Sequence, residues 1–227
     1  MEYLQLVETL KSHAENGFAK FQRRLISTKA QILGVRTPIL RKLAKAYKGE
    51  LDEILTFPDE FYEVTFIKLS VAALQPYDRF VEVLPDCVAA IDNWGTCDSF
   101  KTSSIKRHKA EFLSILEKLF AHGGEFYERY VLVTLLGYYV EEAYLPVISE
   151  YLRRINDENY YVYMGAAWLT AEVIVKYYDE GVDLLKSRLL SPKTHNKAIQ
   201  KARGSFRLTT EQKEFLNSLK IKPNDGR

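Results

Sequence analysis

Residues 112–124, with the sequence FLSILEKLFAHGG, carry the pattern that decides the fold. Apolar side chains recur here at steps of three and four residues, which is the stripe of an amphipathic helix. The glycine pair 123–124 then predicts a turn after the helix. The stripe consists of Phe112, Ile115, Leu116, Leu119 and Phe120.

The same stripe returns along the chain at regular intervals. One copy, Phe80–Val88, lies 32 residues earlier, and weaker copies at Leu145–Leu152 and Val182–Leu189 follow at spacings of 33 and 37 residues. A repeat of about 30 to 40 residues, each a pair of antiparallel helices, is typical of an α-solenoid, because stacked pairs bury a continuous core. We therefore expect an all-α solenoid, a curved stack of helix pairs. Its second helices, on the concave side, are expected at 93–106, 126–140 and 160–177.

Composition limits the class of protein. The chain has 227 residues, of which 47% are hydrophobic and 27% charged, so it is not disordered. Eleven glycines and seven prolines are few for a β-sandwich or barrel. We expect one domain over residues 1–219 and a frayed tail over 220–227.

The sequence predicts a cytoplasmic protein without a membrane segment, a metal or a cofactor. Its apolar runs stay shorter than the roughly 18 residues of a membrane span, and its first residues are too charged for a signal peptide. Two cysteines, Cys87 and Cys97, give no disulfide framework. The four histidines show no metal-ligand spacing with each other or with the cysteines.

Positive charge is concentrated in three segments, although the net charge is only +2. Residues 16–49 hold nine lysines and arginines, 101–109 hold four and 193–207 hold five, all without an acidic residue. A fold that gathers these segments would bind a polyanion, whereas the alternative is that they only solvate helix faces. The representative phosphate-binding residues are Arg36, Lys101, Lys193, Lys197, Lys201 and Arg203.

A candidate site falls on the predicted second helices. Asp92 or Asn93 is a plausible helix cap, and Trp94 and Asp98 then share one face four residues apart. About one repeat later stands Arg129, and the second of the two tryptophans, Trp168, lies in the segment 160–177. Spacing alone leaves open that the tryptophans are core residues and that Asp98 and Arg129 form a structural ion pair.

These residues, from about 18 to 205, resemble the AlkD-type family of DNA alkylation repair proteins, which are HEAT-like solenoids whose active members are DNA glycosylases. The matching motifs are FQRRLI at 21–26, ILGVRTPILR at 32–41, Trp94-x3-Asp98, Arg129 and Trp168. The resemblance implies a monomer that binds double-stranded DNA and hydrolyses the N-glycosidic bond of 3-methyladenine or 7-methylguanine. The damaged base would not need to be flipped into a pocket.

The resemblance also implies a role for each site residue. Asp98 would stabilise the oxocarbenium ion and orient the attacking water. Trp94 and Trp168 would flank the deoxyribose, and Arg129 would hold a phosphate. Active members carry two adjacent arginines where this chain has Arg129-Tyr130, which leaves open a divergent sister branch. The alternative function is a non-catalytic HEAT-repeat scaffold that binds DNA or a protein; a base-per-repeat RNA code fits less well because the second helices lack recurring polar triplets.

Overall fold

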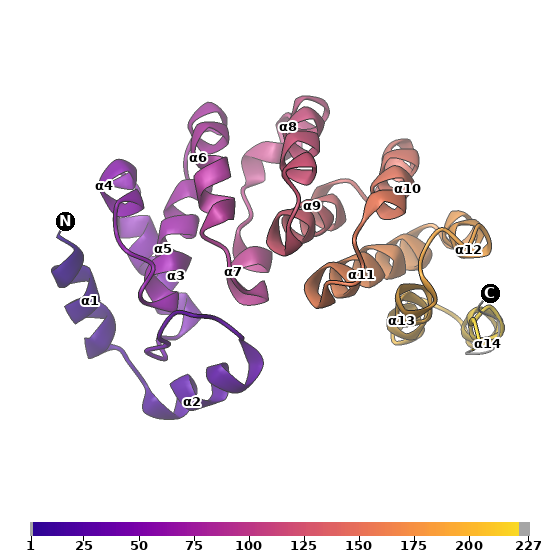
Figure 1. The fold of residues 1–227 in the computed structure, drawn as a ribbon, viewed down its shortest axis with the longest axis horizontal. Helices are drawn as coiled ribbons and strands as arrows, with labels where there is room; N and C mark the ends of the chain where they lie inside the picture. Colours follow the sequence, from indigo (N-terminus) through magenta and orange to yellow (C-terminus); the bar gives the residue numbers. More distant parts are fainter. Residues whose placement is uncertain (1, 223–227) are drawn as a thin grey trace. The chain divides into compact units, whose positions relative to one another are not determined.

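The protein is all-α in its computed structural model, which describes residues 2–222. Within these residues, β pairing is limited to one isolated bridge between Gln31 and Phe61. The chain divides into two compact units, Met1–Ile115 and Leu116–Arg227, and each is described by itself (Figure 1). The predicted fold class is confirmed.

The first unit is built around α5 (Tyr62–Ala73). This helix contacts α1, α3, α4, α6 and α7, and it buries every residue from Tyr62 to Leu69. Because neighbours surround it, α5 lacks an amphipathic stripe and buries polar residues such as Glu63 and Lys68 together with its apolar ones. The helices of this unit are α1 (Tyr3–Ser12), α2 (Asn16–Leu25), α3 (Thr37–Ala46), α4 (Leu51–Leu55), α5 (Tyr62–Ala73), α6 (Tyr77–Ala89), α7 (Trp94–Ser99), η1 (Ser103–Arg107) and the first half of α8 (Lys109–His122).

The second unit is built in the same way around α11, which contacts α9, α12 and α13. Gly181 of α12 lies so close to α11 that a Cβ atom there would sit 2.5 Å from the Cα atom of Ile174. The helices of this unit after α8 are α9 (Glu125–Tyr138), η2 (Glu142–Tyr144), α10 (Leu145–Arg154), α11 (Tyr160–Lys176), α12 (Tyr178–Lys186), α13 (Pro192–Arg203) and α14 (Thr210–Ser218).

The repeating stripes form α6, α8, α10 and α12, as predicted, and the segments 126–140 and 160–177 form α9 and α11. In Figure 1, α10 and α12 lie on one side of α11 and α13, the arrangement expected of stacked helix pairs. The single domain and the curvature of the whole stack stay predictions.

One predicted helix is wrong. The segment 93–106 is not continuous, because α7 ends at Ser99 and a separate 3₁₀ helix begins at Ser103. Phe100 leaves the helical region, with φ −79° and ψ 80°, and its buried ring packs 5.6 Å from that of Phe80. Thr102 then starts the 3₁₀ helix by accepting a hydrogen bond from the Ser104 amide.

The predicted tail is described only as far as Lys222. Within it, the Ile221 amide donates to Asn196 Oδ1 and the Ile221 carbonyl accepts from Asn196 Nδ2, at 2.9 and 2.8 Å. Residues 223–227 lie outside the described residues. None of the helices between residues 2 and 222 is long and apolar enough to cross a membrane.

Candidate functional site

The short helix α7 owes its position to polar contacts at its first turn. Asn93 Oδ1 accepts the amide of Thr96 at 3.0 Å and is the helix cap. The neighbouring Asp92 accepts hydrogen bonds from Thr28 Oγ1 at 2.7 Å, from the Lys29 amide at 2.9 Å and from Asn93 Nδ2 at 2.8 Å. These bonds tie the start of α7 to the segment that follows α2.

Trp94 and Asp98 lie one turn apart on α7, as predicted. The Trp94 indole Nε1–H donates to the Leu25 carbonyl at the end of α2, at 2.9 Å, and its ring is half-buried. Between them, Gly95 faces the core, where an added Cβ would lie 3.1 Å from Tyr62 Oη. The close approach of α5 therefore favours glycine at position 95. Asp98 lies near the C-terminal end of α7 and is partly exposed.

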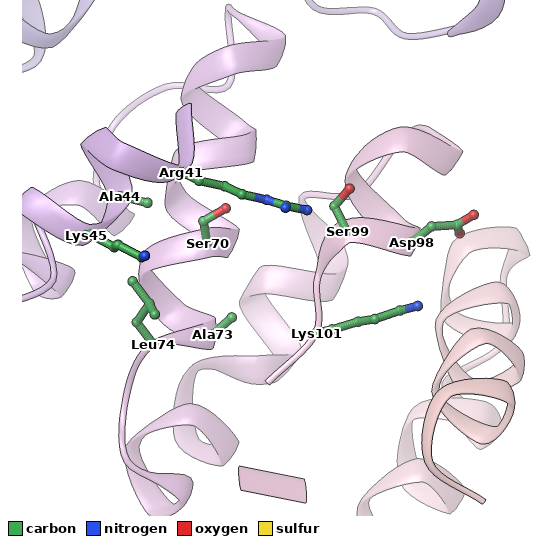
Figure 2. Close-up of a pocket in the computed structure, with 9 residues that line it drawn as sticks. All are labelled: Arg41, Ala44, Lys45, Ser70, Ala73, Leu74, Asp98, Ser99 and Lys101. Carbon is green, nitrogen blue, oxygen red and sulfur yellow. The ribbon is translucent and has the colours of Figure 1, made fainter. Parts of the chain in front are cut away.

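Asp98 borders an open pocket of about 430 Å³ between α3, α5 and α7. Figure 2 shows the Asp98 carboxylate at the edge of this pocket, directed away from Arg41, whose guanidinium extends toward Ser99. Lys45 and Lys101 also line the pocket, and Asp98 is the one acid among its lining residues. Three cations beside one carboxylate make the pocket electropositive and suited to an anion.

Arg41 and Lys45 were not singled out as site residues by the sequence. Both belong to the acid-free basic segment 16–49, and their spacing of four residues places them on one face of α3. This spacing is the feature of the sequence that could have identified both as site residues. Their proximity to Asp98, more than fifty positions away in the sequence, required the packing of α3 and α7 around α5.

In the second unit, Arg129 is buried rather than open to solvent. Its side chain on α9 is 6% exposed, and Nη1 donates to the Tyr161 carbonyl at the start of α11, at 2.8 Å. Gly165 of α11 lies beside it, where an added Cβ would be in ordinary contact with Arg129 Nη1, at 3.7 Å. Arg129 therefore ties α9 to α11. Tyr130, at the position where the family resemblance implies a second arginine, is a buried core residue.

Trp168 is the more exposed tryptophan of the pair. It lies on α11, with 37% of its surface exposed, and lines an open pocket of about 330 Å³ together with Lys201 and Ser205. The structure thus places Trp94 and Asp98 on one helix, and Arg129 and Trp168 on two helices that contact each other.

The predicted phosphate-binding lysines form a row on α13. Lys193, Lys197 and Lys201 are spaced by four residues and share one face. Lys193 Nζ is 3.7 Å from a carboxylate oxygen of Glu158, and Lys197 donates to Gln200 Oε1 at 3.0 Å. Burial, followed by the nearby positive charges of Lys197 and Arg129, lowers the pKa of Lys201. An anion bound along this row would relieve the repulsion.

The two predicted arginines are already engaged in contacts. Arg36 forms a two-bonded ion pair with Glu15, at 3.0 and 2.8 Å, and stacks over the Phe18 ring at 4.3 Å. Arg203 Nη1 donates to Asn217 Oδ1 at 2.9 Å. Their phosphate contacts stay predictions.

Within residues 2–222, no group of three or more His, Cys, Asp and Glu residues could hold a metal ion. A family model described as "DNA alkylation repair enzyme" matches residues 6–184, which is most of the chain. No curated protein matches the sequence.

Proposed function

This chain belongs to the family of DNA alkylation repair enzymes, and from that premise we propose that it is a DNA glycosylase that removes cationic alkylated purines from double-stranded DNA. The observation that carries the proposal is the pocket beside Asp98. It combines one partly exposed carboxylate with the side chains of Arg41, Lys45 and Lys101, and it is open to solvent.

The chemistry requires little beyond such a carboxylate. A purine alkylated at a ring nitrogen, as in 3-methyladenine or 7-methylguanine, is already cationic and leaves without a general acid. Positive charge then develops on the sugar as an oxocarbenium ion. The Asp98 carboxylate would stabilise this cation and accept a proton from the attacking water.

The cations around Asp98 would serve DNA binding. Arg41, Lys45 and Lys101 would hold backbone phosphates, so that the sugar between them lies beside the carboxylate. Phosphate contacts carry no sequence information, which suits an enzyme that must find a lesion in any sequence.

The remaining site residues receive distinct roles. Trp94, fixed by its bond to the Leu25 carbonyl, would offer an electron-rich ring face to the sugar cation beside Asp98. The family resemblance assigns the same role to Trp168, which is exposed on the second unit. Because Arg129 is buried and bonded to the Tyr161 carbonyl, we propose it as a positioning residue for α9 and α11, instead of the direct phosphate contact that the family resemblance implies.

The competing proposal is a non-catalytic helical-repeat protein that binds DNA or a protein. It is favoured by the structural role of Arg129 and the buried Tyr130. The deciding experiment is a base-release assay on methylated double-stranded DNA with the wild-type protein. Release of 3-methyladenine or 7-methylguanine supports the glycosylase, and DNA binding without release supports the competing proposal.

We further propose that the protein is a monomer in the cytoplasm.

Reversing the charge of Lys193, Lys197 and Lys201 to glutamate is expected to weaken DNA binding equally for unrelated sequences. Each lost phosphate contact should reduce the slope of log K against log salt concentration by about one. Fluorescence anisotropy with two duplexes of different sequence, at several salt concentrations, measures both quantities.

The matched control reverses Lys118, Lys186 and Lys213, which belong to the same unit and give the same change in net charge. This control should weaken binding much less. Equal losses from both triple variants would mean that total charge, and not the row on α13, determines affinity.

A further inference from the structure

Phe206 is a large apolar side chain with no protein covering it. Its relative exposure is 101%, whereas the other exposed phenylalanines, Phe21 and Phe215, are at 54% and 44%. It lies in the loop between α13 and α14, which neighbour each other at the C-terminal end of the second unit (Figure 1). Burial of such a ring is favourable, so a fully exposed phenylalanine is a candidate for contact with a partner.

The loop that carries Phe206 is firmly anchored on both sides. Before it, the Gly204 and Ser205 amides donate to the Lys201 and Ala202 carbonyls, at 3.1 and 3.0 Å. After it, Leu208 is buried in the core formed by α11–α14. Thr209 then caps α14 through reciprocal bonds with Gln212. The ring is therefore presented from a fixed base, which lowers the entropy lost on binding.

The surroundings of Phe206 identify the partner. Arg207 follows it directly, and its guanidinium is held at 2.9 Å by Glu172. Gly204 and Ser205, just before it, line the same pocket as Trp168 and Lys201. Glu172 lines this pocket as well. An exposed aromatic ring beside a pocket that holds Lys201 matches a polyanion that also has flat apolar faces, and nucleic acid bases with their phosphates combine these properties.

We propose that Phe206 stacks on a nucleobase of the bound DNA, as an aromatic wedge at the edge of the Trp168 pocket. Apolar side chains inserted at a base step unstack it and open the duplex. The inference rests on the DNA binding in the proposed function, although not on its glycosylase chemistry. Phe206 also lies beyond residues 6–184, the range that the family model matches.

The test uses the full chain and an uncleavable duplex that contains a tetrahydrofuran abasic analogue beside one 2-aminopurine. Fluorescence of 2-aminopurine reports base stacking directly, and anisotropy at several salt concentrations gives the affinity. The variants are Phe206→Ala, Phe206→Trp and, as the matched control, Phe215→Ala, another exposed phenylalanine of the same unit that does not line the Trp168 pocket. Thermal unfolding by circular dichroism checks that each variant is folded.

Phe206→Ala should weaken binding on the order of tenfold, as expected for one lost base–aromatic stack. The salt slope should stay unchanged because no phosphate contact is lost. The fluorescence change seen with wild type should disappear, while Phe206→Trp and Phe215→Ala should retain both signals.

If Phe206→Ala binds DNA with wild-type affinity and gives the wild-type fluorescence change, the proposed wedge is wrong, although the DNA binding itself stands. Equal losses in Phe215→Ala, or an altered oligomeric state of Phe206→Ala in sedimentation, would overturn it in favour of a protein contact. Absence of DNA binding by wild type would overturn both the wedge and the proposed function.

Discussion

Replacing Asp98 by asparagine is expected to lower the rate of base release from methylated DNA by about a hundredfold to a thousandfold. The substitution keeps the size of the side chain and one carbonyl oxygen but removes the negative charge. The oxocarbenium ion then loses its counter-charge, and the attacking water loses its proton acceptor. Single-turnover measurements of released 3-methyladenine and 7-methylguanine, with wild type and variant side by side, give the rate ratio.

The control for this experiment is Ser99→Ala, because Ser99 lines the same pocket and is exposed. It should leave the rate close to that of wild type. Trp94→Ala and Trp168→Ala should reduce the rate less than Asp98→Asn, since each ring gives only part of the stabilisation. If Asp98 has only a structural role, Asp98→Asn will lower the melting temperature and leave base release intact.

Replacing Glu63 by alanine should lower the free energy of unfolding by about 3 kcal/mol or more. Glu63 has no exposed surface, and its carboxylate accepts the backbone amides of Leu33, Gly34 and Val35, at 3.1, 2.7 and 3.2 Å. Removal of the carboxylate leaves these three amides without their acceptor and opens a cavity between α5 and residues 33–35. Urea denaturation followed by circular dichroism measures the loss.

The loop that Glu63 holds cannot easily rearrange to compensate. Gly34 has a φ of 88°, and a Cβ atom there would lie 2.5 Å from the Glu15 carbonyl oxygen at the start of α2. The control variant Glu8→Ala removes an exposed glutamate from the same unit and should change stability by less than about 0.5 kcal/mol. Similar stability of Glu63→Ala and Glu8→Ala would show that these hydrogen bonds contribute little.

The sequence by itself determined the helical class and the positions of six helices, α6 and α8 to α12. The stripes that became α6, α8, α10 and α12 are local signals, because residues three and four apart share a helix face whatever the rest of the chain does. The Asn93 cap is local in the same sense, since its partner Thr96 is three residues away. The break after Ser99 was missed because it depends on the packing of the Phe100 ring against Phe80, twenty positions earlier.

Only the tertiary structure decided which charges face the candidate site and which are buried. Arg41 and Lys45 look like any other members of the segment 16–49 until α3 packs against α5 beside Asp98. Arg129 matches a family position in sequence, yet its burial depends on the Tyr161 carbonyl, which a neighbouring helix supplies. The spacing of apolar residues along the sequence shows which side chains share a face of one helix. Contacts between helices depend on how distant segments pack, and the spacing of residues does not show which segments pack together.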